Sequence, residues 1–173
     1  MTNKTASKTE YLEFEGYVNW AKVYQAETSF GKTEWVIDFF PLNDGELAKV
    51  KASGIQKTMK ENTDPSKGSI GKYIKFTRPE NKVIKGNLVY YTGPIILDQD
   101  GNVIVDYVSK ETGRRVFSYS PENKADVLRR GSPINIGNGS KVKVTVSTYD
   151  TLKGKGHKLE SLKLLELVEY AGR

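Results

Sequence analysis

The sequence predicts a mainly β fold, a β-barrel or sandwich into which one helix is inserted. Segments in which apolar and polar residues alternate recur along most of the chain, as is typical of half-buried strands. Only the stretch 44–61 has the apolar spacing of a long helix. At 173 residues the chain has the size of one domain. We expect this single domain to span residues 10–171, behind a disordered polar tail of residues 1–9.

Two strands are expected first. Residues 10–28 read as a long, aromatic-rich strand, and a turn at Gly31 leads into a second strand over 33–40. The rings of Trp20 and Trp35 fit core positions in these strands better than exposed positions.

The inserted helix should follow over 44–61. Asp44 is a plausible N-cap, and Gly54 weakens the helix in its middle. A polar, glycine-containing loop is expected after it, over 62–71.

Strand signals return in the second half of the chain, over 72–78, 87–98 and 102–108. A short second helix is expected over 120–130, since Pro121 suits a first helical position and Gly131 suits the residue after a helix.

Two strands should close the domain. In residues 141–149, Val142, Val144 and Val146 alternate with polar residues, so the valines should face the core. Residues 158–170 carry apolar side chains on both faces, which predicts a strand that is covered on both sides.

The composition excludes several kinds of site. Without cysteine the chain has no disulfide, zinc ribbon, iron–sulfur cluster or thiol nucleophile. The single histidine, His157, lies in a Gly/Lys-rich segment, where we expect a solvated side chain. The 21 acidic residues are scattered and do not resemble the carboxylate cluster of a metal-dependent nuclease. We therefore expect no enzymatic activity, no cofactor and no metal. We also expect no membrane partner, because no apolar run approaches ~18 residues.

The net charge of +6 favours a polyanionic partner, although a soluble basic surface would give the same charge. Basic residues are interleaved with aromatic ones on the predicted strands, a pattern that suits single-stranded nucleic acid because lysines neutralise phosphates and rings stack on bases. The alternative is that the rings belong to the core and the lysines are solvated edge positions. The candidate DNA-binding residues are Lys22, Tyr24, Lys32, Trp35, Lys72, Lys75, Arg78, Lys141, Lys143, Tyr149, Lys153 and Lys155.

Two segments near the C-terminus resemble a known family. Residues 136–144 combine a Gly-Asn-Gly-Ser-Lys turn with a basic strand, and residues 159–170 read Leu-Glu-Ser-Leu-Lys-Leu-Leu-Glu-Leu-Val-Glu-Tyr. Together they are similar to the single-stranded DNA-binding proteins of short-tailed, coliphage-type bacteriophages, which have a Gly-Gly-Ser-Lys-like turn, a basic strand and a closing Leu-Glu-Ser strand. Upstream, the resemblance is one of element order only.

This resemblance implies an OB-fold barrel and non-catalytic, sequence-independent binding of single-stranded DNA in phage replication and recombination, in the cytoplasm of the bacterial host. It implies DNA contacts for Lys32 and Lys75 and, by approximate position, for Tyr149. It also implies replisome proteins and a second copy of the chain as partners. Family members usually end in a long acidic tail that contacts polymerase and helicase, whereas this sequence ends at Ala171-Gly172-Arg173. We therefore expect no acidic tail and no contacts through it.

Three other functions stay open at this point. An OB-like RNA-binding or duplex-tolerant architectural protein would favour RNA or duplex over single-stranded DNA. A small metal-dependent nuclease would cleave a labelled oligonucleotide. A structural virion component would be found in purified particles.

Overall fold

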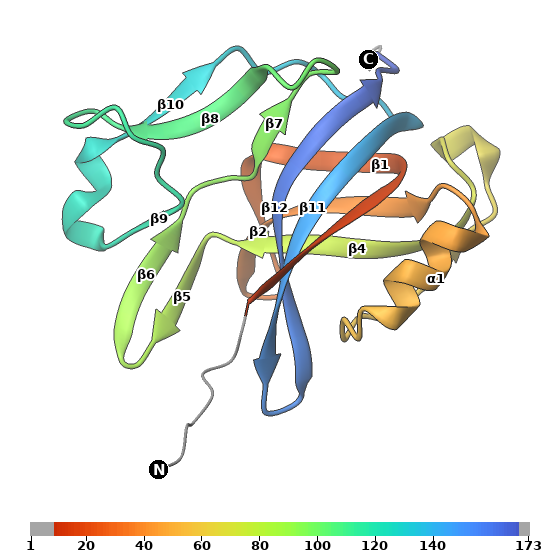
Figure 1. Cartoon of the computed structure of the whole chain (residues 1–173), viewed down its shortest axis with the longest axis horizontal. Helices are drawn as coiled ribbons and strands as arrows, with labels where there is room; N and C mark the ends of the chain where they lie inside the picture. The colour runs from red at the N-terminus through yellow and green to blue at the C-terminus, as the bar shows by residue number, and fades with distance from the viewer. Residues whose placement is uncertain (1–8, 170–173) are drawn as a thin grey trace.

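The computed structural model describes residues 9–169, and within them the chain is mainly β with one α-helix and two short 3-10 helices (Figure 1). The predicted mainly β class with an inserted helix is confirmed. The expected tail and the last residues of the expected domain, 1–8 and 170–173, lie outside the described residues. The strands are β1 (Glu10–Ser29), β2 (Lys32–Pro41), β3 (Lys60–Asn62), β4 (Gly71–Pro79), β5 (Asn81–Ile84), β6 (Asn87–Tyr91), β7 (Ile95–Leu97), β8 (Val103–Ser109), β9 (Ser118–Tyr119), β10 (Val127–Gly131), β11 (Ser140–Thr151) and β12 (Gly154–Glu166). The helices are α1 (Asp44–Ala52), η1 (Pro65–Lys67) and η2 (Pro121–Asp126).

Most strands belong to one nine-stranded sheet of order β10-β8-β7-β12-β11-β1-β2-β4-β3, and a smaller sheet has the order β5-β6-β9. The segment β12-β11-β1-β2-β4 curls around a common core until β4 lies beside β12. Among residues 9–169 no backbone ladder joins these two strands. Instead, the Thr77 amide donates to Nε2 of His157 at 3.0 Å, and Nη1 of Arg78 donates to the Leu159 carbonyl at 3.3 Å. We call this junction the β4–β12 seam; it joins the two ends of the curled segment through side chains, so the predicted barrel is not closed by a backbone ladder among residues 9–169.

The core lies inside this curled segment. Val142, Val144 and Val146 are fully buried, which confirms the predicted inner face of β11. Phe14, the register partner of Val144 on β1, stacks on the Phe76 ring with centroids 5.7 Å apart. The alternation of one strand therefore correctly located the interior of the molecule.

Strand β12 is not covered on both faces, and this prediction is wrong. Leu159 pairs with Val146, yet Ser161 pairs with Thr145, so Glu160 is one extra residue in the ladder. Such a β-bulge moves the following side chains to the opposite face. Consequently Leu159 before the bulge and Leu162 after it are both fully buried in the same core.

The inserted helix is shorter than the predicted span 44–61. Its N-cap is Asn43, whose side chain accepts from the Glu46 amide at 2.9 Å, rather than Asp44. The helix ends at Ala52 because Gly54 takes the left-handed conformation, with φ of 77°, and Ile55 then forms a bridge to Lys155.

The second predicted helix, 120–130, is also corrected. Only η2 is helical, and residues 127–131 form β10, which pairs with β8. The physical reason is nonlocal: the fully buried carboxylate of Asp106 on β8 requires cations, and Arg130 supplies one at 2.8 Å. The predicted strand 87–98 is divided into β6 and β7, which belong to different sheets.

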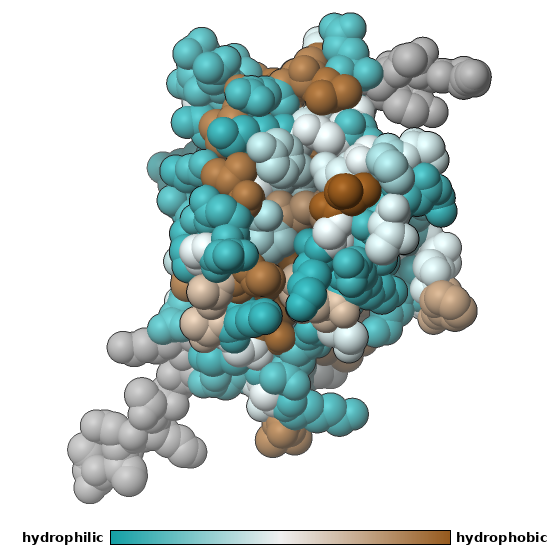
Figure 2. All heavy atoms as spheres, turned by 90° about the vertical axis from the view of Figure 1, so that its right-hand side faces the viewer, coloured by the Kyte–Doolittle hydropathy of each residue, from teal (hydrophilic) through white to brown (hydrophobic). Residues whose placement is uncertain are grey.

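Among residues 9–169, no helix is both long and apolar enough to cross a membrane. On the face that carries α1, apolar residues are interspersed with hydrophilic ones rather than gathered into one large area (Figure 2).

Candidate nucleic-acid interface

The residues predicted to contact DNA do not gather on one surface. Trp35 and Arg78 are buried, with 6% and 2% of their surface exposed. The core position expected for Trp35 is confirmed, and its ring is not accessible for stacking on a base. Trp20, for which a core position was also expected, is instead 49% exposed.

Most of the predicted lysines are accessible, but several already have an acidic partner. Lys75 binds Asp38 at 2.6 Å, and Lys22 binds Glu27 at 2.9 Å. Lys155 and Lys143 have partners at 3.0 and 3.7 Å, respectively. Lys32, Lys72 and Lys153 are exposed at separate places, and Lys141 and Tyr24 are half-buried.

A groove beside β12 brings aromatic and basic side chains together more closely. It lies between β12 and the smaller sheet, which are neighbours in Figure 1. We call it the β12 groove; its lining residues are Tyr11, Arg78, Tyr91, Ile95, Arg115, Phe117, Ser118, Thr145, Lys158, Glu160 and Ser161. They come from seven strands and from the loop before β9.

Cations lie over the tyrosine rings at this groove. The Lys158 ammonium is 4.3 Å from the centre of the Tyr91 ring, and the Arg78 guanidinium approaches the same ring at 5.5 Å. Lys82 lies 4.8 Å from the Tyr149 ring. Each of these contacts is short enough for a cation–π interaction. Partial burial lowers the pKa of Lys158 and raises that of Tyr91.

Tyr149 was expected to be exposed on the outer face of β11, but it is half-buried. Its ring lies against Gly156 of β12, since a Cβ at this glycine would come within 2.5 Å of a ring carbon. Its hydroxyl donates to the His157 carbonyl at 3.4 Å. The hairpin partner strand therefore covers one side of the ring.

Two other rings at the groove are more open. Tyr11 is 67% exposed and Phe117 is 51% exposed. Tyr11 pairs with Ser147 on the outer face of the sheet, whereas Phe117 comes from the loop before β9. These two rings offer the larger free surfaces for stacking.

The groove floor is held by Arg78. Its guanidinium donates to the carbonyls of Thr92 at 2.6 Å and Phe117 at 3.1 Å, and to Glu160 at 3.2 Å. Desolvation lowers the pKa of Arg78, while Glu160 opposes that shift. Arg78 thus supports the groove from beneath instead of projecting into solvent.

His157 is not the solvated loop residue that its sequence context predicted. It is buried at the β4–β12 seam against the Phe76 ring, and its Nε2 accepts the bond from Thr77. Burial lowers its pKa to about 4. The imidazole of His157 is therefore neutral and serves the fold as a hydrogen-bond acceptor.

Among the described residues, no three His, Asp or Glu side chains converge as a metal-binding group would require.

Sequence reasoning missed Tyr11, Tyr91, Phe117 and Lys158. Tyr11 could have been placed opposite the polar face of β11 only if the β1–β11 pairing had been known. For Phe117, nothing in the sequence of its loop distinguishes it from an ordinary exposed residue.

Comparisons with known proteins yield one structural likeness. No protein-family model matches the chain, and no curated protein matches its sequence. A solved structure, that of gp2.5, a single-stranded DNA-binding protein encoded by bacteriophage T7, aligns with 97% of this chain and 91% of its own at 18% identity and a TM-score of 0.47. At that TM-score the likeness carries no argument about function.

Proposed function

We propose that this protein binds single-stranded DNA without catalysing a reaction, and that the β12 groove is its principal contact surface. The observation that carries the proposal is the convergence of accessible rings, Tyr11 and Phe117, with the Lys158 ammonium around one groove. Arg115 also lines the groove, but its guanidinium binds Asp106 at 3.1 Å. Rings of this kind stack on any base, and cations beside them neutralise phosphates.

The acidic residue in the groove does not oppose this role. Both carboxylate oxygens of Glu160 are engaged, one by Arg78 at 3.2 Å and the other by the Ser147 hydroxyl at 2.6 Å. The net charge of +6 adds a sequence-independent attraction for a polyanion.

We further propose a role in phage DNA replication or recombination, in the cytoplasm of the bacterial host, with replisome proteins and a second copy of the chain as additional partners. The resemblance of residues 136–144 and 159–170 to the phage single-stranded DNA-binding family supports this context.

The test is a titration of labelled dT oligomers of graded length, repeated with RNA and duplex competitors and with divalent metal. We expect tight binding of dT, weak competition by duplex and no cleavage. If about five phosphates are neutralised, log K should fall with log salt at a slope near −3.5, from ~0.7 per phosphate. A flat salt response, stronger competition by RNA or duplex, or cleavage that follows the protein through a final sizing column would contradict the proposal.

A further inference from the structure

The backbone of Trp20 has an unusual conformation. Its φ is 51°, in the left-handed region that bulky residues rarely adopt. Residues in such conformations are strained and persist only when their surroundings enforce them. The β1–β2 register shifts between Asn19 and Lys22, so Trp20 lies at an interruption of the ladder.

A network of asparagines holds this conformation. Oδ1 of Asn138 accepts from the Trp20 amide at 2.7 Å, and its Nδ2 donates to the Lys67 carbonyl at 2.8 Å. The neighbouring Asn19 is 2% exposed, and its side chain bonds both the amide and the carbonyl of Ser69, at 3.0 and 3.1 Å. Segments from three parts of the chain thus hold the backbone at Trp20.

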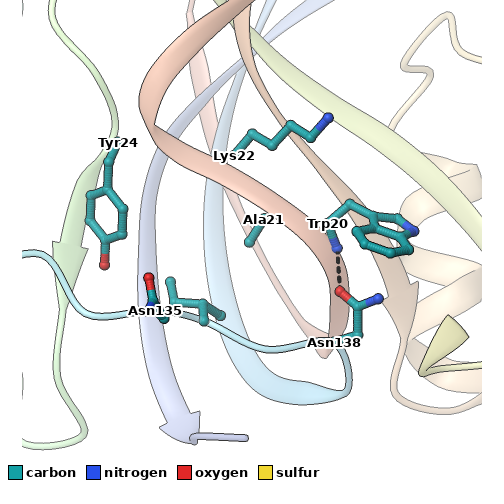
Figure 3. A pocket seen from close by; sticks show the side chains of 7 residues that line it. Trp20, Ala21, Lys22, Tyr24, Asn135 and Asn138 are labelled. Atoms are coloured by element: carbon teal, nitrogen blue, oxygen red, sulfur yellow. Dashed lines mark hydrogen bonds between the residues drawn. The ribbon is translucent and has the colours of Figure 1, made fainter. Parts of the chain in front are cut away.

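The result of this strain is an accessible indole beside a pocket. The pocket has a volume of about 200 Å³, and its lining residues are Trp20, Ala21, Lys22, Tyr24, Asn135, Ile136 and Asn138. Figure 3 shows Trp20 and Tyr24 at opposite ends, with the 135–138 segment along one side. A cavity of ~150 Å³ accommodates a benzene ring, so this pocket has room for one planar base.

The surroundings of the pocket also suit a nucleotide. Lys22 is exposed at its rim, where it binds Glu27 at 2.9 Å. Burial raises the pKa of the Tyr24 phenol, and Arg129 is close enough to oppose that shift. The Asn135 side chain is exposed and offers both donor and acceptor groups.

We infer that the Trp20 pocket takes one base of a bound single strand by stacking on the indole, as a second contact point outside the β12 groove. This inference rests on the proposed function. Thr145 lines the groove, and Ser140, five residues along β11, pairs with Val18 beside the pocket. At ~3.3 Å per residue the two sites are about 17 Å apart along β11, a span that one oligonucleotide can bridge.

Tryptophan fluorescence tests the inference directly. The chain has two tryptophans, and Trp35 is buried, so a Trp35→Phe variant reports on Trp20 alone. Saturable quenching of this variant by dT oligomers is expected. In the wild-type protein, acrylamide should quench the accessible Trp20, and bound dT oligomer should protect it, which provides the same readout if Trp35→Phe does not fold.

Affinity measurements complete the test. Trp20→Ala should weaken dT binding by about 5- to 150-fold, the range for loss of one stacked base, and Trp20→Phe should retain most of the affinity. Phe30→Ala is the matched control, since Phe30 is a fully exposed ring at a positive φ of 51° in the β1–β2 turn.

The two proposals fail in different ways. If wild-type protein binds dT but Trp20 is neither quenched nor protected and Trp20→Ala binds normally, the inference is overturned and the proposed function stands. If Trp20→Ala changes the oligomeric state and leaves DNA affinity intact, the inference is likewise overturned. If wild-type protein does not bind dT at all, the proposed function itself is wrong.

Discussion

The β1–β11 pair and the β4–β12 seam are held together in contrasting ways. Between β1 and β11, nine consecutive residue pairs from Glu10 to Val18 form an unbroken antiparallel register. At the β4–β12 seam, the imidazole of His157 and the guanidinium of Arg78 replace the ladder. A ladder depends on backbone atoms and tolerates many side chains, whereas the seam depends on two particular side chains.

This difference makes the seam both vulnerable and useful. Arg78 also supports the Tyr91 ring and the Phe117 loop of the β12 groove, so the closure of the curled sheet and the shape of the groove share one residue. Changes at the seam should therefore disturb folding and DNA binding together, while changes at the groove rim should affect binding alone.

The largest effect is expected from Arg78→Met. Removal of the guanidinium takes one donor from the Glu160 carboxylate and from three backbone carbonyls, and breaking a buried pair costs about 3–5 kcal/mol of unfolding free energy. Urea denaturation measures this loss. Lys143→Met is the control, since its exposed pair with Glu13 bridges β1 and β11, which already share a ladder, and should cost no more than ~1 kcal/mol. Equal losses in the two variants would remove the distinction between seam and ladder.

Acidification should weaken the seam next. The pKa of His157 falls from 6.5 to about 4 on folding, so the unfolded chain binds the proton first as the pH drops. The stability contributed by the neutral imidazole is complete above pH 6.5 and is lost between pH 6.5 and about 4, by about 3 kcal/mol in total. Denaturation of the wild type and His157→Gln across this range measures the effect, because the variant lacks the titrating group. Parallel pH curves for the two proteins would be evidence against a buried neutral His157.

At the groove rim, Phe117→Ala should reduce affinity for dT oligomers by roughly 1–3 kcal/mol through loss of one stacking ring. Its melting temperature should change little, because the ring is 51% exposed. Val144→Ala is the opposite control: a cavity in the core should lower stability with little direct effect on affinity. If Phe117→Ala destabilises the fold as Val144→Ala does, the loop is part of the core rather than of the interface.

Half-buried Tyr149 should show an intermediate result. Tyr149→Ala is expected to lower both affinity and melting temperature, because the ring contacts Gly156 as well as the Lys82 cation. Fluorescence anisotropy with labelled dT and a thermal melt measure the two effects. A change in affinity alone would mean that the ring is free in solution.

The smallest expected effect is on salt dependence. Lys158→Gln should make the slope of log K against log salt less steep by ~0.7, if this lysine contacts one phosphate. Lys153→Gln, at the exposed tip of the β11–β12 hairpin, tests whether the hairpin end also contacts DNA. An unchanged slope for Lys158→Gln would locate the strand elsewhere.

Local patterns predicted the parts of this molecule that local forces determine. The alternation around Val144 identified a core strand, and Pro41 coincides with the last residue of β2. The seam could not be predicted from the sequence, because Thr77 and His157 are 80 residues apart. The burial of a histidine between glycines and lysines depends on that pairing. The sequence predicted an interface of rings beside lysines. Trp35 and Arg78 are interior, however, because strand pairing rather than residue type decides which face is covered.

The extra residue at Glu160 limits how related chains can change in length. Loss of Glu160 would leave a regular ladder in which Leu159 and Leu162 still face the core, but it would remove the carboxylate that binds Arg78. The hairpin turn at Leu152 is fully exposed and can gain or lose residues at little cost. Related chains that lack the bulge residue should therefore also lack an arginine at the position of Arg78, while the turn a few residues earlier varies freely.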